Sequence, residues 1–189
     1  MKKVFIIMMM ALMSLGAQAQ EQLVFEQVVT KDGKSSEQIY DLIKRWIATT
    51  YKSAKDVIQL DSPNKELTLK AKIEYKEKSM TWAAASGYID YTVDFLIKDN
   101  RFKVIIGPFS HVSTHYKWGA EWSNGILYKG EPNDELFEKL GIKKMARKQY
   151  REIDKRVKPL TQKEIESIMY SLLNKLDNVA GSNDNDWDF

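Results

Sequence analysis

Two histidines stand four residues apart in the segment 111–115, HVSTH. On a helix this spacing would let His111 and His115 bind one metal ion. The segment follows Pro108 and contains β-branched residues, which favours a strand with a rise of about 3.3 Å per residue. A strand separates the two imidazoles by about 13 Å, too far for one ion held at about 2 Å from each. We therefore predict neither a metal site nor a cofactor here.

The same histidines lie next to Ser110 and Ser113, so a hydrolase remains an alternative. A nucleophilic serine needs an adjacent base and a third group that orients it. The chain shows no nucleophile elbow, phosphate loop, zinc-protease motif or dinucleotide fingerprint. We assign no catalytic residue, and the alternative function is a small hydrolase with a site around His111 or His115 and the loop at 117–125.

Two carboxylates, Asp90 and Asp94, share one face of a predicted strand. The carboxyl groups of glycosidases lie roughly 5 to 9.5 Å apart, whereas the strand separates these two by about 13 Å. The pair alone therefore cannot act in this way. Solvated ion pairs with Lys70, Lys72 or Lys103 across strands are the favoured interpretation.

Strands and one helix must position these residues. Apolar and polar residues alternate at 67–75, 88–97 and 102–106, with shorter β-rich segments at 23–29 and 57–60. Asp99-Asn100 joins the last two long strands as a tight hairpin. Each long strand has an apolar and a polar face, which is typical of an antiparallel sheet covered on one side.

The cover is an amphipathic helix predicted at 36–53. Ser35 and Gln38 form a capping box at its start. Its apolar residues recur at helical spacing and are Ile39, Ile43, Trp46, Ile47 and Tyr51. The side chain of Trp46 needs a wide apolar surface, so we expect it to be buried against the sheet.

The third section of the chain is predicted to be a helical pair. An apolar stripe from Ile142 to Val157 ends at Pro159, which is expected to break the helix. Thr161 and Glu164 form a capping box that would start a second helix. The two helices should pack together on the sheet or on the first helix.

The N-terminal residues predict export. Lys2 and Lys3 precede an apolar run at 4–15, and Ala17-Gln18-Ala19 has the small-x-small pattern of a signal-peptidase site. We expect cleavage near Ala19 and a periplasmic or secreted mature protein. Its formal charge falls from +3 to +1, which gives no case for nucleic-acid binding, and no second apolar run predicts a transmembrane span.

These observations divide the chain into five parts. The predicted divisions are a signal peptide at 1–19, an α+β sheet domain at 20–110, a loop or strand connection at 111–132, a helical extension at 133–180 and a disordered acidic tail at 181–189. The chain has no cysteine, so a hydrophobic core rather than disulfides must stabilise it.

The order of strand, capped helix and antiparallel meander resembles a known family. Tyr40 and Trp46-Ile47 lie on the helix, and residues 97–102, IKDNRF, form the last hairpin. Over roughly residues 22–107 the chain resembles exported bacterial proteins catalogued as a domain of unknown function with a TATA-binding-protein-like fold. The resemblance implies a curved antiparallel sheet with a helix on its convex side. It implies no activity, and the fold alone does not imply DNA binding.

Two groups of residues are candidates for ligand binding. If the polar face of the sheet is bare, it could hold a peptide, a glycan or a partner domain; the alternative is plain solvent or coverage by the C-terminal helices. Its candidate residues are Lys70, Lys72, Tyr88, Asp90, Thr92 and Lys103. The second group, Trp118 and Trp122, could stack on a sugar, although we favour a role as loop anchors.

Two segments could contact other partners. The basic helix at 143–158 could lie on an anionic membrane surface, or its charges could simply face water. Trp187 and Phe189 in the acidic tail leave open a docking motif. We therefore predict an exported, non-catalytic module for binding or envelope assembly, whose partner is an unknown envelope protein or glycan.

Overall fold

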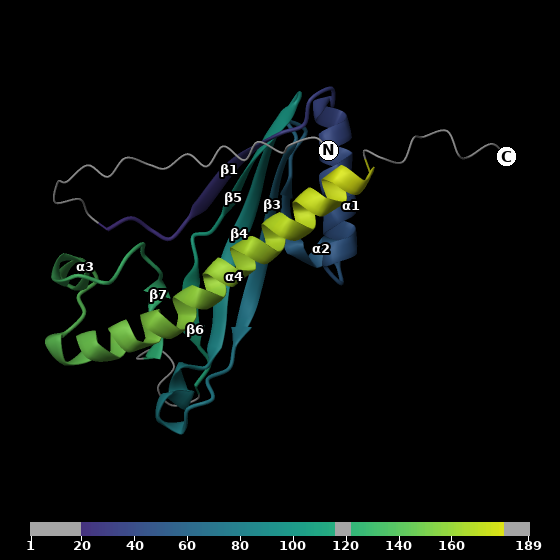
Figure 1. The fold of residues 1–189 in the computed structure, drawn as a ribbon. Coiled ribbons are helices and arrows are strands. Elements are labelled where there is room, and N and C mark those ends of the chain that lie inside the picture. The colour runs from purple at the N-terminus through teal and green to yellow at the C-terminus, as the bar shows by residue number, and fades with distance from the viewer. Residues whose placement is uncertain (1–19, 116–121, 180–189) are drawn as a thin grey trace, which may run out of the picture.

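The computed structural model describes residues 20–115 and 122–179 (Figure 1). The predicted signal peptide, Trp118 and the acidic tail lie outside these residues. Its elements in chain order are β1 Phe25–Thr30, α1 Ser36–Thr50, α2 Ala54–Val57, β2 Ile58–Asp61, β3 Glu66–Tyr75, the 3₁₀ helix η1 Met80–Ala85, β4 Gly87–Lys98, β5 Arg101–Ile106, β6 Ser110–Ser113, β7 Gly125–Ile126, α3 Asp134–Lys139, the 3₁₀ helix η3 Lys144–Ala146 and α4 Arg147–Val179.

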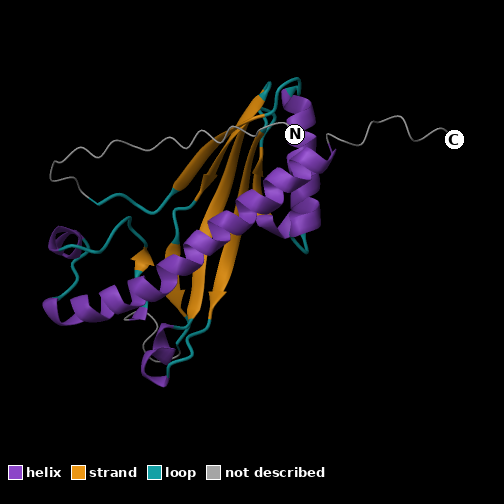
Figure 2. Ribbon diagram, viewed as in Figure 1, coloured by secondary structure: helices purple, strands orange, loops and turns teal. Residues whose placement is uncertain are grey.

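The strands form one antiparallel sheet in the order β1-β5-β4-β3-β2 (Figure 2). On one side, β4 pairs with the whole length of β3. On its other side it pairs with β5 near its C-terminal end and with β6 near its N-terminal end, and β7 follows β6. The prediction of an α+β fold with an antiparallel sheet is confirmed.

The hairpin between β4 and β5 also fixes the start of α1. Asn100 adopts a left-handed conformation, with φ of 63°, as a tight turn requires. Its side-chain oxygen accepts a hydrogen bond from the Gly33 amide at 2.8 Å, and Asp99 accepts one from the Ser36 amide at 2.7 Å. The capping box predicted for Ser35 is present.

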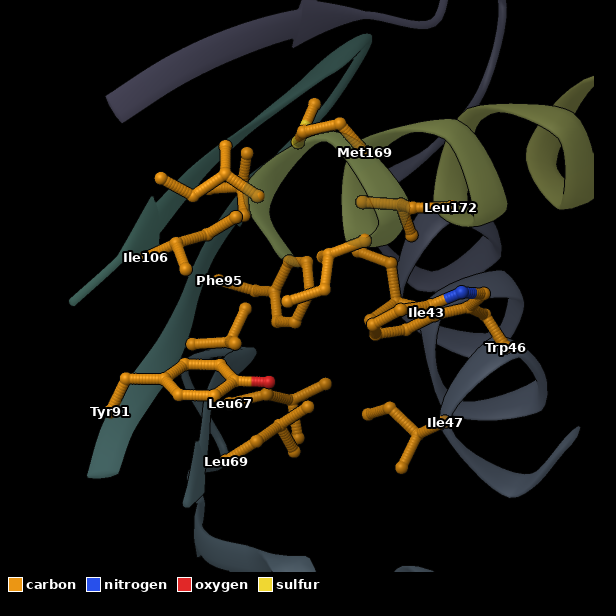
Figure 3. Packing of buried hydrophobic residues seen from close by; sticks show 14 of the residues in the cluster. Ile43, Trp46, Ile47, Leu67, Leu69, Tyr91, Phe95, Ile106, Met169 and Leu172 are labelled. Carbon is orange, nitrogen blue, oxygen red and sulfur yellow. The ribbon is translucent and has the colours of Figure 1, made fainter. Parts of the chain in front are cut away.

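The hydrophobic core lies between the apolar face of the sheet and two helices, α1 and α4 (Figure 3). Trp46 is only 1% exposed and meets Phe95 of β4 edge to face, with ring centroids 5.9 Å apart. Its indole nitrogen donates a hydrogen bond to the Ser171 hydroxyl of α4 at 3.0 Å. The predicted burial of Trp46 is confirmed, and α4 shares with α1 the role of covering the sheet.

The predicted C-terminal helical pair is wrong, because α4 runs unbroken through Pro159. Thr161 does not begin a helix; its hydroxyl donates a hydrogen bond to the Lys158 carbonyl at 2.8 Å. A proline inside a helix costs about 3 kcal/mol. Val157 and Ile165 are buried on either side of it, and each apolar side chain so buried contributes about 1.5–3 kcal/mol. Burial along one continuous stripe therefore outweighs the break.

The course of α4 across the sheet is diagonal, from the β6 end toward the start of α1 (Figure 2). Its contacts follow this course in sequence: Arg156 with Glu77 after β3, Glu164 with Tyr91 of β4, Ser171 with Trp46 of α1 and Asp177 with Lys31 after β1. The helix therefore lies over both ends of the sheet.

Candidate binding site

A cavity of about 520 Å³ lies beside β3, where the end of α1, α2, the strands β3 and β4, and α4 meet. Its lining residues are Tyr51, Asp56, Val57, Lys70, Ala71, Lys72, Asp90, Tyr91 and Glu164. Side chains of a strand alternate between its two faces. Ala71 and Tyr91 belong to the apolar face of the sheet. Lys70, Lys72 and Asp90 alternate with them along the strands and therefore belong to the polar face. Residues of both faces thus line the cavity.

The cavity opens at an edge of the sheet. β2 pairs with β3 only at Leu67, Thr68 and Leu69. From Lys70 to Tyr75, β3 pairs with β4 on its inner side, and no described strand pairs with its outer side (Figure 1). Half of this strand is therefore an edge strand.

The hydrogen bonds around β4 show which backbone groups point to this edge. The Thr92 carbonyl accepts from the Gly107 amide at 2.9 Å, so it points away from β3. Lys70 lies opposite Thr92 and therefore forms a non-hydrogen-bonded pair with it. Alternate residues of a strand repeat this direction, so Lys70, Lys72 and Glu74 direct their amide and carbonyl groups outward.

Three polar groups form a cluster on the core side of the cavity. The Tyr91 hydroxyl donates a hydrogen bond to Glu164 Oε1 at 2.6 Å. The Tyr51 hydroxyl lies close enough to Tyr91 and Glu164 for all three groups to interact electrostatically. The ring of Tyr91 stacks on Phe109, with centroids 5.2 Å apart, and this contact holds its hydroxyl in place. The cluster thus presents hydrogen-bonding groups in a wall that also carries apolar and charged side chains.

The electrostatics of this cluster keep both tyrosines neutral. Burial and, to a lesser extent, the nearby Glu164 charge raise the pKa of Tyr51 to about 12. Burial also raises the pKa of Tyr91, as does its hydrogen bond to Glu164. Both hydroxyls are therefore hydrogen-bond donors at neutral pH, and neither is poised to act as a base.

The structure brings together only part of the predicted polar site. Lys70, Lys72 and Asp90 line the cavity. The Lys72 amine lies 4.4 Å from the ring centroid of Tyr88, which places Tyr88 next to the cavity on the polar face. The Thr92 hydroxyl donates to the Gly107 carbonyl at 2.8 Å and holds the start of the next loop.

Lys103 lies elsewhere on the sheet and pairs with Glu26 at 2.6 Å, instead of with the predicted Asp90 or Asp94. It lines a second, smaller hollow of about 200 Å³ near the β4–β5 hairpin. The other lining residues are Val28, Leu96, Lys98, Arg101 and Phe102. The predicted polar site is therefore divided between two separate places.

Trp122 is partly buried and packs against the hydrophobic core. Its ring meets Trp82 of η1 edge to face at 5.7 Å, and the Arg156 guanidinium of α4 lies 5.0 Å from the centroid of Trp82. Arg156 in turn contacts Glu77 at 3.5 Å. These contacts connect the loop before β7 to α4, which agrees with the anchoring role that we favoured for Trp122.

His111 is fully buried, and backbone groups engage both of its ring nitrogens. Nε2 lies 2.8 Å from the Ala85 carbonyl, and Nδ1 accepts from the Asn124 amide at 3.2 Å. Burial lowers the pKa of His111, so it is neutral. The hydroxyl of Ser113 donates to the Ala84 carbonyl at 2.6 Å and is not directed at the imidazole. This geometry gives the hydrolase alternative no support at His111.

Acidic and histidine side chains do not gather into a metal-binding group of three or more within residues 20–115 and 122–179. Across these same residues, no helix combines the length and apolar composition that crossing a membrane requires.

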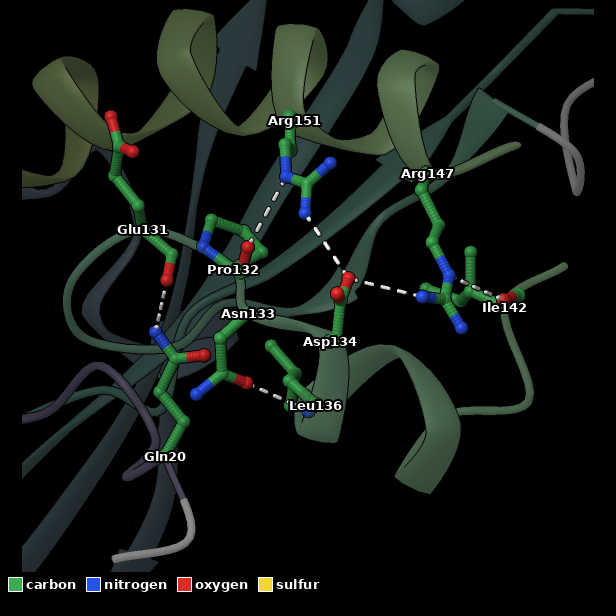
Figure 4. A network of polar contacts seen from close by, with 9 residues as sticks. All are labelled: Gln20, Glu131, Pro132, Asn133, Asp134, Leu136, Ile142, Arg147 and Arg151. Carbon is green, nitrogen blue, oxygen red and sulfur yellow. Dashed lines mark hydrogen bonds and ion pairs between the residues drawn. The ribbon is translucent and has the colours of Figure 1, made fainter. Parts of the chain in front are cut away.

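Several charges of the basic segment 143–158 bind other parts of the protein (Figure 4). Arg147 and Arg151 both contact Asp134 of α3, at 3.0 and 3.5 Å. Their guanidinium groups also lie over the Phe137 ring. Lys158 pairs with the buried Asp154 at 2.6 Å. These cations stabilise the packing of α4 and are not all available to a membrane.

The sequence reasoning missed most of the core side of the cavity. Tyr51 and Tyr91 were assigned to apolar faces, and Glu164 to a capping box. A buried tyrosine hydroxyl usually finds a hydrogen-bond partner. Two tyrosines on facing apolar surfaces were therefore a signal for a polar group between them, although their separation in sequence did not identify Glu164.

This combination of one antiparallel sheet with helices on one face is an α+β architecture of the TATA-binding-protein-like class. The crystal structure of a TBP-like protein from Parabacteroides distasonis ATCC 8503 superposes with a TM-score of 0.51 at 12% identity, covering 83% of this chain and 94% of that one. At this identity, the similarity shows the fold alone.

Residues 25–111 match the family described as a domain of unknown function (DUF4468) with TBP-like fold, and this segment belongs to that family. The resemblance recognised in the sequence is confirmed. A DUF4468 family protein from Bacteroides ovatus ATCC 8483 is also similar, with a TM-score of 0.46 at 14% identity over 89% of this chain and 91% of that one. A comparison with curated proteins found no match.

Proposed function

We propose that the protein is an exported, non-catalytic module that acts in ligand binding or in assembly of the cell envelope. The observation that carries this proposal is the open cavity with the Tyr51, Tyr91 and Glu164 cluster in its wall. Its volume falls within the range of about 300–1,000 Å³ that is common for ligand sites. Its wall combines the apolar side chains of Val57 and Ala71 with tyrosine and charged side chains, and such polar groups fix the orientation of a ligand.

The chemistry of the described groups favours binding over catalysis. Neutral tyrosines held by a carboxylate can donate and accept hydrogen bonds but do not activate a nucleophile. The one carboxylate that they hold, Glu164, is already bound to Tyr91. We therefore expect a ligand to be held and released without chemical change.

A cavity-filling substitution tests the proposal. Ala71→Trp places a large side chain in the cavity wall, whereas Val112→Trp adds the same side chain at an exposed position of β6. We would measure binding of envelope glycan fragments and of peptides to the full chain by calorimetry. A ligand that binds the native protein and Val112→Trp but not Ala71→Trp supports the proposal. Equal binding to all three proteins would overturn the cavity as the site.

The proposed export has its own measurement. The N-terminal pattern supports cleavage near Ala19. Mass spectrometry of the protein from fractionated cells should then find a chain that begins near Gln20 in the periplasmic or secreted fraction. An intact Met1 in the cytoplasmic fraction would contradict export.

Peripheral membrane contact is a second proposal. It concerns residues 143–148 instead of the whole basic segment 143–158. Met145 is 97% exposed, and Lys143, Lys144 and Lys148 around it are exposed as well. An apolar tip among cations can bind an anionic lipid surface. Met145→Asp should reduce sedimentation with vesicles of anionic lipid, whereas Met80→Asp, at a side chain that is 95% exposed on η1, should not. Equal sedimentation of both variants would contradict this contact.

A further inference from the structure

We propose that the outer edge of β3, from Lys70 to Tyr75, binds an extended peptide segment of a partner protein as an added antiparallel or parallel strand. The partner segment carries acidic side chains at alternate positions and apolar side chains between them. This inference rests on the proposed binding function and names the ligand class for the same cavity.

The backbone of the edge provides the first part of the argument. Lys70, Lys72 and Glu74 direct their amide and carbonyl groups outward, as the Thr92 carbonyl contact shows. Strand addition satisfies such groups with main-chain hydrogen bonds. β2 already occupies the same edge beside Leu67 and Leu69, so a peptide would continue the line of β2 along β3.

The charges provide the second part. Lys70 and Lys72 are exposed and belong to the polar face of β3. In an added strand, the side chains that share this face occur at every second residue. Carboxylates at these positions would lie opposite the two lysines, and cross-strand pairs of opposite charge stabilise a sheet. Acidic residues are therefore the complement of this face at Lys70 and Lys72, whereas Glu74 disfavours a third acidic residue directly opposite it.

The cavity provides the third part. The other side chains of an added strand would point to the core side, where Ala71 and Ile73 are only partly buried. Because Ala71 is small, it leaves the cavity open toward the cluster of Tyr51, Tyr91 and Glu164. Apolar or aromatic side chains would bury the exposed parts of Ala71 and Ile73, and an indole nitrogen could donate to the Glu164 carboxylate.

Lysines on an edge strand commonly protect it from pairing with other chains. Here they shield only the polar face of β3, while the core side retains an open cavity. A peptide with the complementary pattern would convert the same lysines from repulsive to attractive groups. The lysines therefore disfavour pairing with most strands and favour pairing with strands that carry acidic residues opposite them. Repulsion of the wrong partners together with attraction of the right one is a common source of specificity.

A matched pair of synthetic heptapeptides tests this inference. The sequence NDNDWDF, which stands at 183–189 of this chain, alternates aspartate with other residues and has a tryptophan before and a phenylalanine after its last aspartate. The control peptide DDDNNWF has the same composition without the alternation. Each is added to the full chain, and amide hydrogen exchange is followed residue by residue.

We expect NDNDWDF to slow exchange at Lys70, Lys72 and Glu74, by about tenfold at a concentration ten times its Kd. The control peptide should leave these amides unchanged. Protection by both peptides, or protection at the outer edge of β1 instead, would overturn the inference. These amides could also exchange slowly in the absence of peptide and lose this protection when the protein is diluted. That result would identify a second copy of the chain as the occupant and would also overturn the inference.

Substitutions at Lys72 separate the backbone from the charge. Lys72→Pro removes an outward amide without removing a bond to β4, so it should abolish peptide binding, whereas Lys72→Ala should only weaken it. If Lys72→Pro fails to fold, Lys72→Glu provides the test: it should lose NDNDWDF and gain a peptide in which lysines replace the aspartates. Unchanged binding of NDNDWDF to Lys72→Glu would overturn the inference.

These outcomes distinguish the two proposals. If NDNDWDF fails to bind but a glycan binds in a manner that Ala71→Trp abolishes, strand addition is wrong and the binding module remains supported. If neither peptides nor glycans bind the full chain, both proposals are wrong.

Discussion

The two halves of β3 have different surroundings. Its first half, around Leu67 and Leu69, is paired on both sides and covered by α1 and α4, and both leucines are almost fully buried. Its second half, around Ala71 and Ile73, is paired on one side only and borders a cavity. One strand therefore combines a packed region with a region that has no neighbouring strand on one side and leaves part of its apolar surface exposed.

The two halves of β3 are therefore expected to have different roles, the first in the stability of the fold and the second in ligand binding. A buried side chain with well-packed neighbours contributes free energy to folding. A partly exposed side chain beside an unpaired edge contributes less to folding and retains the capacity to contact a ligand. Substitutions along β3 and around its cavity should reveal this division.

The largest expected effect is at Leu69. Leu69→Ala should lower the free energy of unfolding by about 2–5 kcal/mol, because it leaves a cavity in the packed half. Ile73→Ala, on the same face in the open half, should cost only about 1 kcal/mol. Urea denaturation of both variants measures the difference. Equal losses would contradict the division of β3 into two regions.

The next effect concerns α4, which crosses both regions. Pro159→Ala should raise the free energy of unfolding by about 1–3 kcal/mol, because alanine restores a helical amide and removes the proline's clash. If residues 147–179 were two helices separated at Pro159, the substitution would be neutral or destabilising. The urea midpoint and its slope distinguish these results.

A smaller effect is expected at the cavity. Tyr91→Phe should lower the free energy of unfolding by about 0.5–1.5 kcal/mol, since it removes the hydrogen bond to Glu164. Tyr170→Phe is the matched control, because Tyr170 lies on α4 and is 73% exposed. Thermal unfolding should separate the two variants. A Tyr91→Phe protein as stable as the control would mean that the cluster contributes nothing to folding.

The smallest effect is a pH dependence at His111. Burial lowers the pKa of His111 in the folded state below the unfolded value of about 6.5. As the pH falls through this value, the unfolded chain takes up a proton that the folded chain does not, so stability decreases. The expected loss is under about 1 kcal/mol between pH 7.5 and 6.

Urea midpoints across this pH range measure the effect. His111→Asn should remove that part of the pH slope. A wild-type slope identical to that of His111→Asn would show that burial does not perturb His111.

Much of the fold was predictable from local sequence patterns. The alternation in β3, β4 and β5 and the capping box of Ser35 depend on neighbouring residues, and the structure contains them all. The continuity of α4 was not predicted, because Pro159 was treated as a local stop. The apolar positions Val157 and Ile165 continue one stripe past it, and only the packing against the sheet shows that this stripe prevails.

The candidate site was only partly predictable. Lys70, Lys72 and Asp90 were identified because they share a polar strand face. Tyr51 and Glu164 were not, since they come from the end of α1 and the middle of α4 and meet only in the folded chain. Sequence patterns show which face a residue occupies, whereas the meeting of three elements depends on the tertiary structure.

The bonds between the Asp99-Asn100 hairpin and the loop before α1 have a consequence for protein engineering. A tight turn at the tip of two strands is ordinarily a favourable place to insert an epitope or a fluorescent label. Here both side chains of the turn hold the amides of Gly33 and Ser36. An insertion at this tip would detach the beginning of α1, so labels belong elsewhere, for example beside the exposed Met80.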